Sequence, residues 1–258
     1  MKLYAKFFLM SLRSQMEYKA SFLMTSIGIM FTSLGELIAI HFLMRRFHSI
    51  AGFNYPQVLI CYSIVVMAFT LAELAARGFD HFPTILRNSE FDRIMLRPAN
   101  IMLQVLTSRL DLQRASKVLL SGVVLAYAIT HSGIEWTAMR VLVLILMILG
   151  GTMMFIGLFI LFATICFFTL EGLEVFNILT DGSRNYGEYP VSIYGKWILR
   201  LYTFVLPLAC VQYYPLNYLL GRTNSLFYGL LPLMGFVFLI PCRLLWSVGV
   251  RHYKSNGS

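Results

Sequence analysis

The feature that most constrains this fold is a long apolar run without a charged residue, which extends from Val141 to Leu170. As an α-helix with a rise of about 1.5 Å per residue, the run would be about 45 Å long, and the hydrocarbon core of a bilayer is about 30 Å thick. The composition agrees, because only 13% of the residues are charged, compared with about a quarter in soluble domains. The run therefore predicts a membrane-spanning helix that tilts or projects beyond the bilayer.

Further apolar runs predict that the chain crosses the membrane several times. Each is close to or above the roughly 18 residues that a spanning helix needs. The runs cover residues 22–43, 58–76, 115–134, 201–220 and 226–248. We therefore expect an all-α polytopic protein in which a single transmembrane domain, residues 1–258, contains six transmembrane helices. The first segment, 1–21, mixes basic and apolar residues and predicts an amphipathic helix at the membrane interface.

Two polar stretches separate these runs, one at residues 77–117 and one at residues 171–200. Most of the 21 Lys and Arg residues lie in these stretches and near the two termini. Since basic segments of membrane proteins face the cytoplasm, we expect both termini and both polar loops to be cytoplasmic. Arg45 and Arg46 are exceptions, because this topology places them on the outer side.

Catalytic and metal-binding motifs are absent from the sequence. There is no GxxxxGK[ST] loop to hold phosphates, no HExxH pair and no GxSxG turn. The 5 histidines are scattered and the 4 cysteines lie in apolar runs, so neither a metal site nor a disulfide framework is predicted. The net charge of +9 lies beside apolar runs, which suits a bilayer rather than a nucleic acid. We expect a protein that is not itself an enzyme, with no catalytic residue and no metal site.

Three motifs carry a resemblance to a known family. They are EFDRIMLRPANIMLQVL (residues 90–106), TDGSRNYGEYPVSIYGKW (residues 180–197) and LYTFVLPLACVQYYPLNYLLG (residues 201–221). Together and in this order, they resemble the six-span permease subunits of bacterial ABC-type exporters in the ABC-2 family. Gly195 stands where this resemblance leads us to expect a proline.

The resemblance implies a permease subunit of an ATP-driven exporter in the bacterial inner membrane. Such a permease pairs with a second permease, identical or homologous, and each half docks on a cytoplasmic subunit that binds ATP and Mg²⁺. No cofactor is then expected in this chain, and its remaining partners are membrane lipids rather than nucleic acid. A secondary transporter and a membrane-embedded enzyme are the alternatives, and ATP dependence separates them from the permease.

The residues that the resemblance implies for coupling to the ATPase lie in a short helix of the first polar stretch. Ser89 is the candidate N-cap, acidic residues in the first turn complement the helix dipole, and Pro98 ends the helix. Phe91 and Leu96 are the expected apolar anchors. The full coupling set is Phe91, Asp92, Arg93, Met95, Leu96 and Arg97. In the alternative interpretation, the basic residues bind anionic lipid headgroups.

Two further groups of candidate residues follow along the chain. In the second polar stretch they are Tyr189, Pro190, Tyr194 and Trp197. In the fifth apolar run they are Pro207, Tyr213, Tyr214 and Pro215. The resemblance implies that this second group breaks the helix and forms an outer gate. The alternative is an interfacial belt of aromatic residues at the outer headgroups.

Glu36 is an acidic residue well inside an apolar run. A carboxylate in a membrane span costs a few kcal/mol and usually faces a polar cavity or a partner. One interpretation is a residue of the substrate pathway or of the dimer interface. The other is a protonated or snorkelling side chain, paired with His41.

Overall fold

The computed structural model describes residues 17–47, 49–169 and 173–253. Apart from an isolated bridge between Ile50 and Phe53, these residues form helices, turns and connections without a strand. This confirms the all-α prediction. Most of the interfacial helix predicted for 1–21 falls on residues 1–16, which lie outside the described residues.

Five helices in the described ranges are long and apolar enough to cross a membrane. They are Lys19–Phe47, Tyr55–Arg87, Leu112–His131, Ala138–Ile165 and Leu226–His252. Their main helices are α2 (Lys19–Phe47), α3 (Tyr55–Asp80), α7 (Ala115–His131), α8 (Ala138–Ile165) and α14 (Met234–His252). They correspond to five of the six predicted spans. The chain is therefore a multi-pass membrane protein.

The fifth predicted span, at residues 201–220, is not one continuous helix but is interrupted, as the family resemblance implied for Pro207 and Pro215. The segment is divided among α10 (Lys196–Phe204), α11 (Leu208–Val211) and α12 (Tyr213–Leu219). Pro207 lies between α10 and α11, where it has no N–H group to continue the helical hydrogen bonds. Gln212 lies between α11 and α12, and its buried side-chain amide donates to the main-chain oxygens of Gly187 and Tyr189, at 3.2 and 3.1 Å.

The second polar stretch, which we expected to be a loop, contains helix α9 (Leu173–Gly187). This helix packs against α3 and α8. Its polar residue Arg184 forms an ion pair with Glu36 of α2. Part of the polarity that suggested an exposed loop therefore belongs to a helix in which Arg184 has an acidic partner inside the bundle.

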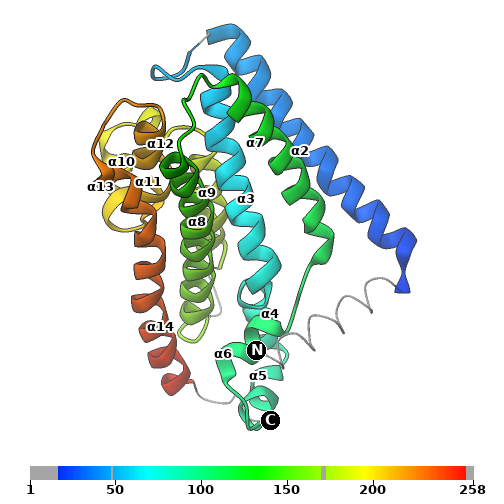
Figure 1. The fold of residues 1–258 in the computed structure, drawn as a ribbon. Helices are drawn as coiled ribbons and strands as arrows, with labels where there is room; N and C mark the ends of the chain where they lie inside the picture. Colours follow the sequence, from blue (N-terminus) through cyan, green and yellow to red (C-terminus); the bar gives the residue numbers. More distant parts are fainter. Residues whose placement is uncertain (1–16, 48, 170–172, 254–258) are drawn as a thin grey trace.

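Shorter helices gather at the two ends of the molecule (Figure 1). One end, which we call the α5 end, carries α4 (Phe82–Arg87), α5 (Glu90–Met95) and α6 (Ile101–Thr107), followed by η1 (Leu112–Arg114). The opposite end, which we call the α12 end, carries α10, α11, α12 and α13 (Leu226–Leu230). The remaining single turns are η2 (Val191–Tyr194) and η3 (Leu231–Leu233).

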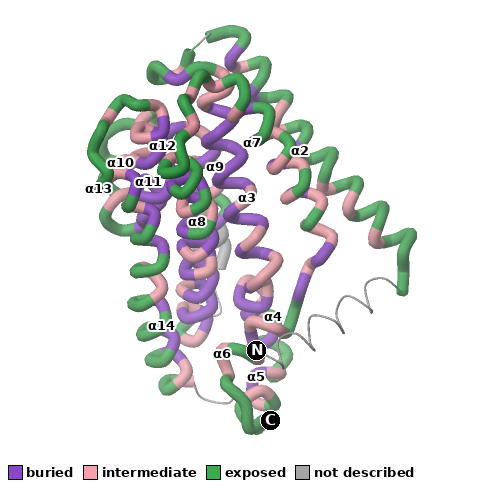
Figure 2. The backbone as a smooth tube through the Cα atoms, viewed as in Figure 1, coloured by how far each residue is buried: buried purple, intermediate pink, exposed green. Residues whose placement is uncertain are grey.

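Helix α3 is the centre of the bundle and packs against both α7 and α8, while α14 packs against the other side of α8. Figure 2 shows that buried residues concentrate along α3 and α8. The contact between α8 and α14 brings two backbones together. A Cβ at Gly150 would lie 2.2 Å from the oxygen of Pro232, and one at Gly235 would lie 2.0 Å from the oxygen of Gly150. Such close approach through glycines is typical of helix packing in membranes.

Helix α2 is mostly exposed and lies at the edge of the bundle, against α7 and η1 (Figure 2). Its exposed side chains are largely apolar: Leu23, Met24, Ile27, Phe31, Ile38 and Phe42. An exposed apolar face of this length fits a helix surrounded by lipid tails.

Candidate coupling surface and interior charge network

The predicted coupling helix exists as α5, but its aromatic anchor faces inward. Phe91 is fully buried and packs edge-on against Phe82, Phe167 and Tyr253, with ring centroids 4.8 to 5.3 Å apart. Its ring therefore attaches α5 to the ends of α8 and α14. The prediction that Phe91 contacts a partner is corrected, because the sequence cannot reveal aromatic partners so distant along the chain.

Asp92 also makes a contact within the chain. Its Oδ1 atom accepts a hydrogen bond from the hydroxyl of Tyr253, at 3.1 Å, just beyond the end of α14. Burial and the neighbouring Asp92 carboxylate raise the pKa of Tyr253 above its usual value, so the phenol keeps the proton that it donates. Asp92 thus fastens α5 to the end of α14.

The exposed side of this region is formed by the residues that follow Asp92. Leu96 is 85% exposed and Met95 is 39% exposed. Arg93 and Arg97 are also exposed, and among the described residues neither forms an ion pair with an acidic side chain. The surface therefore combines an exposed apolar side chain with two cations that form no ion pair within the described part of the chain.

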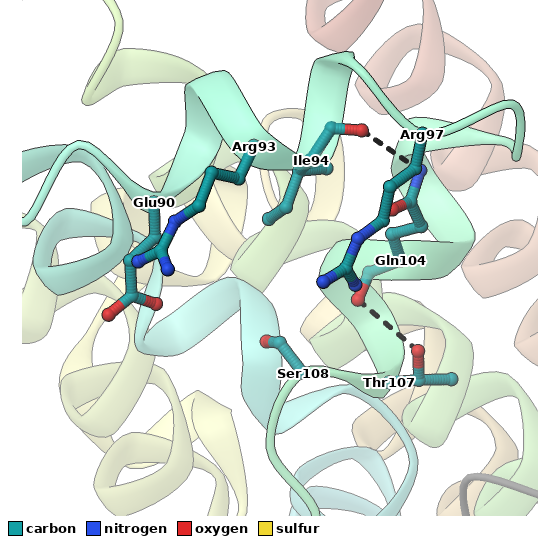
Figure 3. A pocket seen from close by; sticks show the side chains of 7 residues that line it. All are labelled: Glu90, Arg93, Ile94, Arg97, Gln104, Thr107 and Ser108. Carbon is teal, nitrogen blue, oxygen red and sulfur yellow. Dashed lines mark hydrogen bonds between the residues drawn. The ribbon is translucent and has the colours of Figure 1, made fainter.

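A pocket of about 420 Å³ lies between α5 and α6 beside this surface. Figure 3 shows Glu90 and Arg93 close together on one side of it, and Arg97 beside Gln104 of α6 on the other. The Gln104 amide nitrogen holds the two helices together by donating to the main-chain oxygens of Ile94 and Ala99, at 3.1 and 3.0 Å. The two arginines therefore lie on α5 and on the turn that follows it, and Gln104 of α6 fixes the position of this segment.

Both helices are positioned by local contacts. Asn100 caps α6, since its side-chain oxygen accepts from the amides of Met102 and Leu103, at 2.9 and 3.3 Å. Ser89 precedes α5 with a positive φ of 55° and makes no side-chain capping bond, so the cap predicted there is wrong. Gly78 of α3 is required for close packing, because a Cβ there would lie 1.8 Å from the oxygen of Val105 in α6.

An ion-pair network lies immediately inside the α5 end. Glu73 of α3 is buried and pairs with Arg77, at 2.5 Å, and with Arg114 of η1, at 2.6 Å. Arg77 also contacts Asp80 and Asp111, at 3.1 and 3.4 Å. The network ties η1, and hence the end of the α4–α6 region, to the central helix.

A second ion-pair network lies around Glu36. Its carboxylate contacts Arg184 of α9, at 2.6 Å, and Lys117 of α7, at 3.4 Å. It also accepts a hydrogen bond from the hydroxyl of Tyr62 in α3, at 3.0 Å. Glu36 therefore joins four helices.

The partner that the sequence suggested for Glu36 is wrong. The ring of His41 packs against Tyr55 and Phe42, with centroids 5.6 and 6.0 Å away, and Glu36 is paired with Arg184 and Lys117 instead. The 148 residues between Glu36 and Arg184 explain why a sequence pattern did not reveal the pair.

The candidates from the second polar stretch lie toward the α12 end. The main-chain oxygen of Tyr189 is bound by Gln212 next to α12, and Pro190 is buried at the start of η2. The ring of Tyr194 packs against that of Tyr186, at 4.7 Å. Trp197 is 81% exposed on α10. The structure thus places these residues at the opposite end from α5 (Figure 1), so the expectation that both polar stretches lie on the same side of the membrane is wrong for residues 189–197.

Three of the four predicted gate residues lie in the first turn of α12. Tyr214 contacts the rings of Tyr213 and Tyr228, at 5.3 and 5.6 Å, and its hydroxyl lies 3.2 Å from that of Thr203. Pro215 is buried in the first turn of α12, where a proline is tolerated because that N–H has no helical partner. Pro207 precedes α11. The contacts form a packed cluster of aromatic rings, whose role as a gate remains a prediction.

Groups of three or more His, Cys, Asp or Glu side chains able to hold a metal ion do not occur among the residues that the structure describes. The charged interior consists instead of acids paired with arginines and a lysine. Such an arrangement stabilises contacts between helices rather than a bound ion.

The fold and these sites define a class: a multi-helix membrane protein with a structured polar segment at one end of the bundle. A comparison with protein families makes the class specific. A family model described as "ABC-2 family transporter protein" matches residues 30–257, which is nearly the whole chain. The chain belongs to this family and is a membrane permease component of an ABC transporter. Searches of curated proteins and of solved structures found no match.

Proposed function

We propose that this chain is the permease subunit of an ATP-driven exporter and that it docks on a separate ATP-binding subunit through the α5 end. Its membership of the ABC-2 family supports a partner ATPase in general terms. The docking site is inferred from Leu96, which is exposed and is flanked by the exposed Arg93 and Arg97. In this proposal, two permeases, identical or homologous, form the translocation pathway, and the α5 end is cytoplasmic.

The roles within the coupling segment divide between two sets of residues. Phe91 and Asp92 fix α5 to α8 and α14 through the contacts with Phe167 and Tyr253. Leu96, the neighbouring Met95 and the two arginines contact the ATPase. A large exposed apolar residue supplies burial at an interface, and unpaired arginines orient the partner through its carboxylates. A movement of the ATPase would be transmitted to the helix bundle through Phe91 and Asp92.

A secondary transporter is the main alternative, and Glu36 is the residue on which it would depend. Such transporters use ionisable residues near the bilayer midplane to bind coupling ions. Here Glu36 and Glu73 are each already paired with two cationic side chains. This pairing favours a structural role for both carboxylates, so the ATP-driven permease is the better supported function.

The test is to purify the tagged chain from its native host in mild detergent and to measure the ATP-binding subunit that comes with it. Leu96→Ala should reduce the recovered ATPase by about tenfold, as expected for the loss of a central interface side chain. Trp197→Ala is the matched control, because Trp197 is similarly exposed but lies at the opposite end. Equal recovery from wild type and Leu96→Ala would contradict the docking site, and a preparation free of ATPase would contradict the function.

A further inference from the structure

A second pocket at the α5 end differs from the one beside Arg93 in its charge. It has a volume of about 470 Å³ and lies between the end of α14 and the start of α6. Two of its lining residues are Arg243 and Arg251, and no acidic residue lines it. The pocket beside Arg93, in contrast, contains Glu90.

The two arginines lie on the same face of α14. They are eight positions apart, and residues at a spacing of three to four or seven to eight share a helical face. Both side chains are exposed, and among the described residues neither forms an ion pair. Two guanidinium groups thus line a single pocket, and no acidic side chain from residues 17–47, 49–169 or 173–253 pairs with them.

Other groups in the pocket suit an anionic ligand. Asn100 and Ser247 line it and supply polar side-chain atoms, and Trp246 forms an apolar wall that is itself 96% buried, since its exposed fraction is 4%. The Ser247 hydroxyl donates to the main-chain oxygen of Arg243, so its oxygen can accept a hydrogen bond from a hydroxyl group of a headgroup but cannot donate to the phosphate.

The position of the pocket relative to the membrane indicates where its anionic ligand comes from. Arg251 is in the last turn of α14, and the apolar segment that could span the membrane ends at His252. The same helix exposes an apolar surface next to the pocket, formed by Ile240, Leu244, Leu245 and Val248. A molecule with a phosphate beside the arginines and hydrocarbon chains along this apolar surface would match both the charged pocket and the surface next to it.

We propose that this pocket binds the phosphate headgroup of an anionic phospholipid from the leaflet at the α5 end. Arginine matches phosphate with two parallel charge-assisted hydrogen bonds, and basic pockets between transmembrane helices bind such headgroups. The lipid would bridge α14 and the segment that begins α6. It would thereby add a contact to the region that holds α5, without using the residues that we assign to ATPase docking.

The test is native mass spectrometry of the full-length chain titrated with phosphatidylglycerol, phosphatidylcholine or inorganic phosphate. We expect phosphatidylglycerol to bind at least tenfold more tightly than phosphatidylcholine. The double variant Arg243→Gln/Arg251→Gln should lose that preference, and Arg243→Lys/Arg251→Lys should retain part of it. The control Arg87→Gln/Arg200→Gln removes two exposed arginines elsewhere and should bind as the wild type does.

Competition distinguishes the two sources of phosphate. If millimolar inorganic phosphate leaves bound phosphatidylglycerol in place, the ligand is the lipid. If inorganic phosphate displaces it, the site recognises phosphate but is filled from solution, and the lipid assignment is overturned. Equal binding of both lipids, or an unchanged preference in the glutamine double variant, would overturn the site itself.

Discussion

The charges inside the bundle and the charges at the α5 surface are organised in opposite ways. Glu36 and Glu73 each contact two cations, at distances between 2.5 and 3.4 Å. Arg93 and Arg97, by contrast, are exposed and have no acidic partner among the described residues. The interior charges therefore hold the helices together, whereas the arginines at the α5 surface are available to another molecule. Substitutions should therefore separate stability from docking.

The largest loss of stability is expected for Glu73→Ala. Removing this carboxylate leaves Arg77 and Arg114 without their closest anion, and breaking a buried ion pair costs about 3–5 kcal/mol. The measurement is the unfolding transition in detergent. Glu135→Ala is the control, since Glu135 is exposed and should change stability by less than about 0.5 kcal/mol. Similar transitions for both variants would contradict the role given to the interior network.

A smaller loss is expected when Gly78 is replaced by alanine. The added methyl group would meet the main-chain oxygen of Val105, and overpacking of this kind costs about 1–3 kcal/mol. Because α6 would be displaced from α3, the variant should also be cleaved faster by protease near α6. Gly28→Ala is the control, since nothing lies within 4 Å of a Cβ at that position. Unchanged cleavage of the Gly78 variant would show that α6 does not depend on this contact.

Tyr253→Phe should cost about 1 kcal/mol, because it removes one hydrogen bond to Asp92. The ring remains, so its packing on Phe91 is kept. The expected result is a slightly lower unfolding temperature with reduced coupling between ATP hydrolysis and transport. Asp92→Asn tests the same bond from the other side. If combining the two changes gives the sum of their separate effects, the two groups do not interact in the working protein.

The smallest change in stability is expected for Arg93→Gln/Arg97→Gln, at less than about 0.5 kcal/mol, because these exposed side chains have no ion pair to lose. The same variant should bind the ATP-binding subunit more weakly, which pull-down experiments would measure. Loss of folding together with loss of binding would show that the two arginines belong with the interior set.

The sequence was sufficient to predict the long helices because hydropathy over about 20 residues is a local property. It also located α5, since Pro98 and the acidic first turn bound that helix. Hydropathy alone did not reveal that residues 201–220 are broken, because their apolar character is the same in a continuous span and in short helices packed on α8; the break was implied only by the family resemblance of Pro207 and Pro215. Gln212, whose hydrogen bonds help hold this arrangement, reaches carbonyl groups more than 20 residues away.

The sequence located the candidate coupling surface, but it did not show which of its residues are exposed and which are buried. Leu96 is exposed, as an interface residue must be, yet Phe91 faces the interior. Nothing in the local pattern distinguishes them, because the partners of Phe91 come from the ends of α8 and α14. Likewise Arg184 looked like a residue of a cytoplasmic loop until the structure paired it with Glu36. Long-range pairs of this kind require the tertiary structure.

The most direct test of the central claim is a crosslinking experiment in native membranes. The described cysteines, Cys61, Cys166, Cys210 and Cys242, are all buried, so a new exposed cysteine would react with little background. Leu96→Cys, treated with a thiol-to-amine crosslinker, is expected to give a product that contains the ATP-binding subunit, whereas Trp197→Cys should give none. Crosslinking of the ATPase through residue 197 but not through residue 96 would place the docking surface at the α12 end and contradict the account.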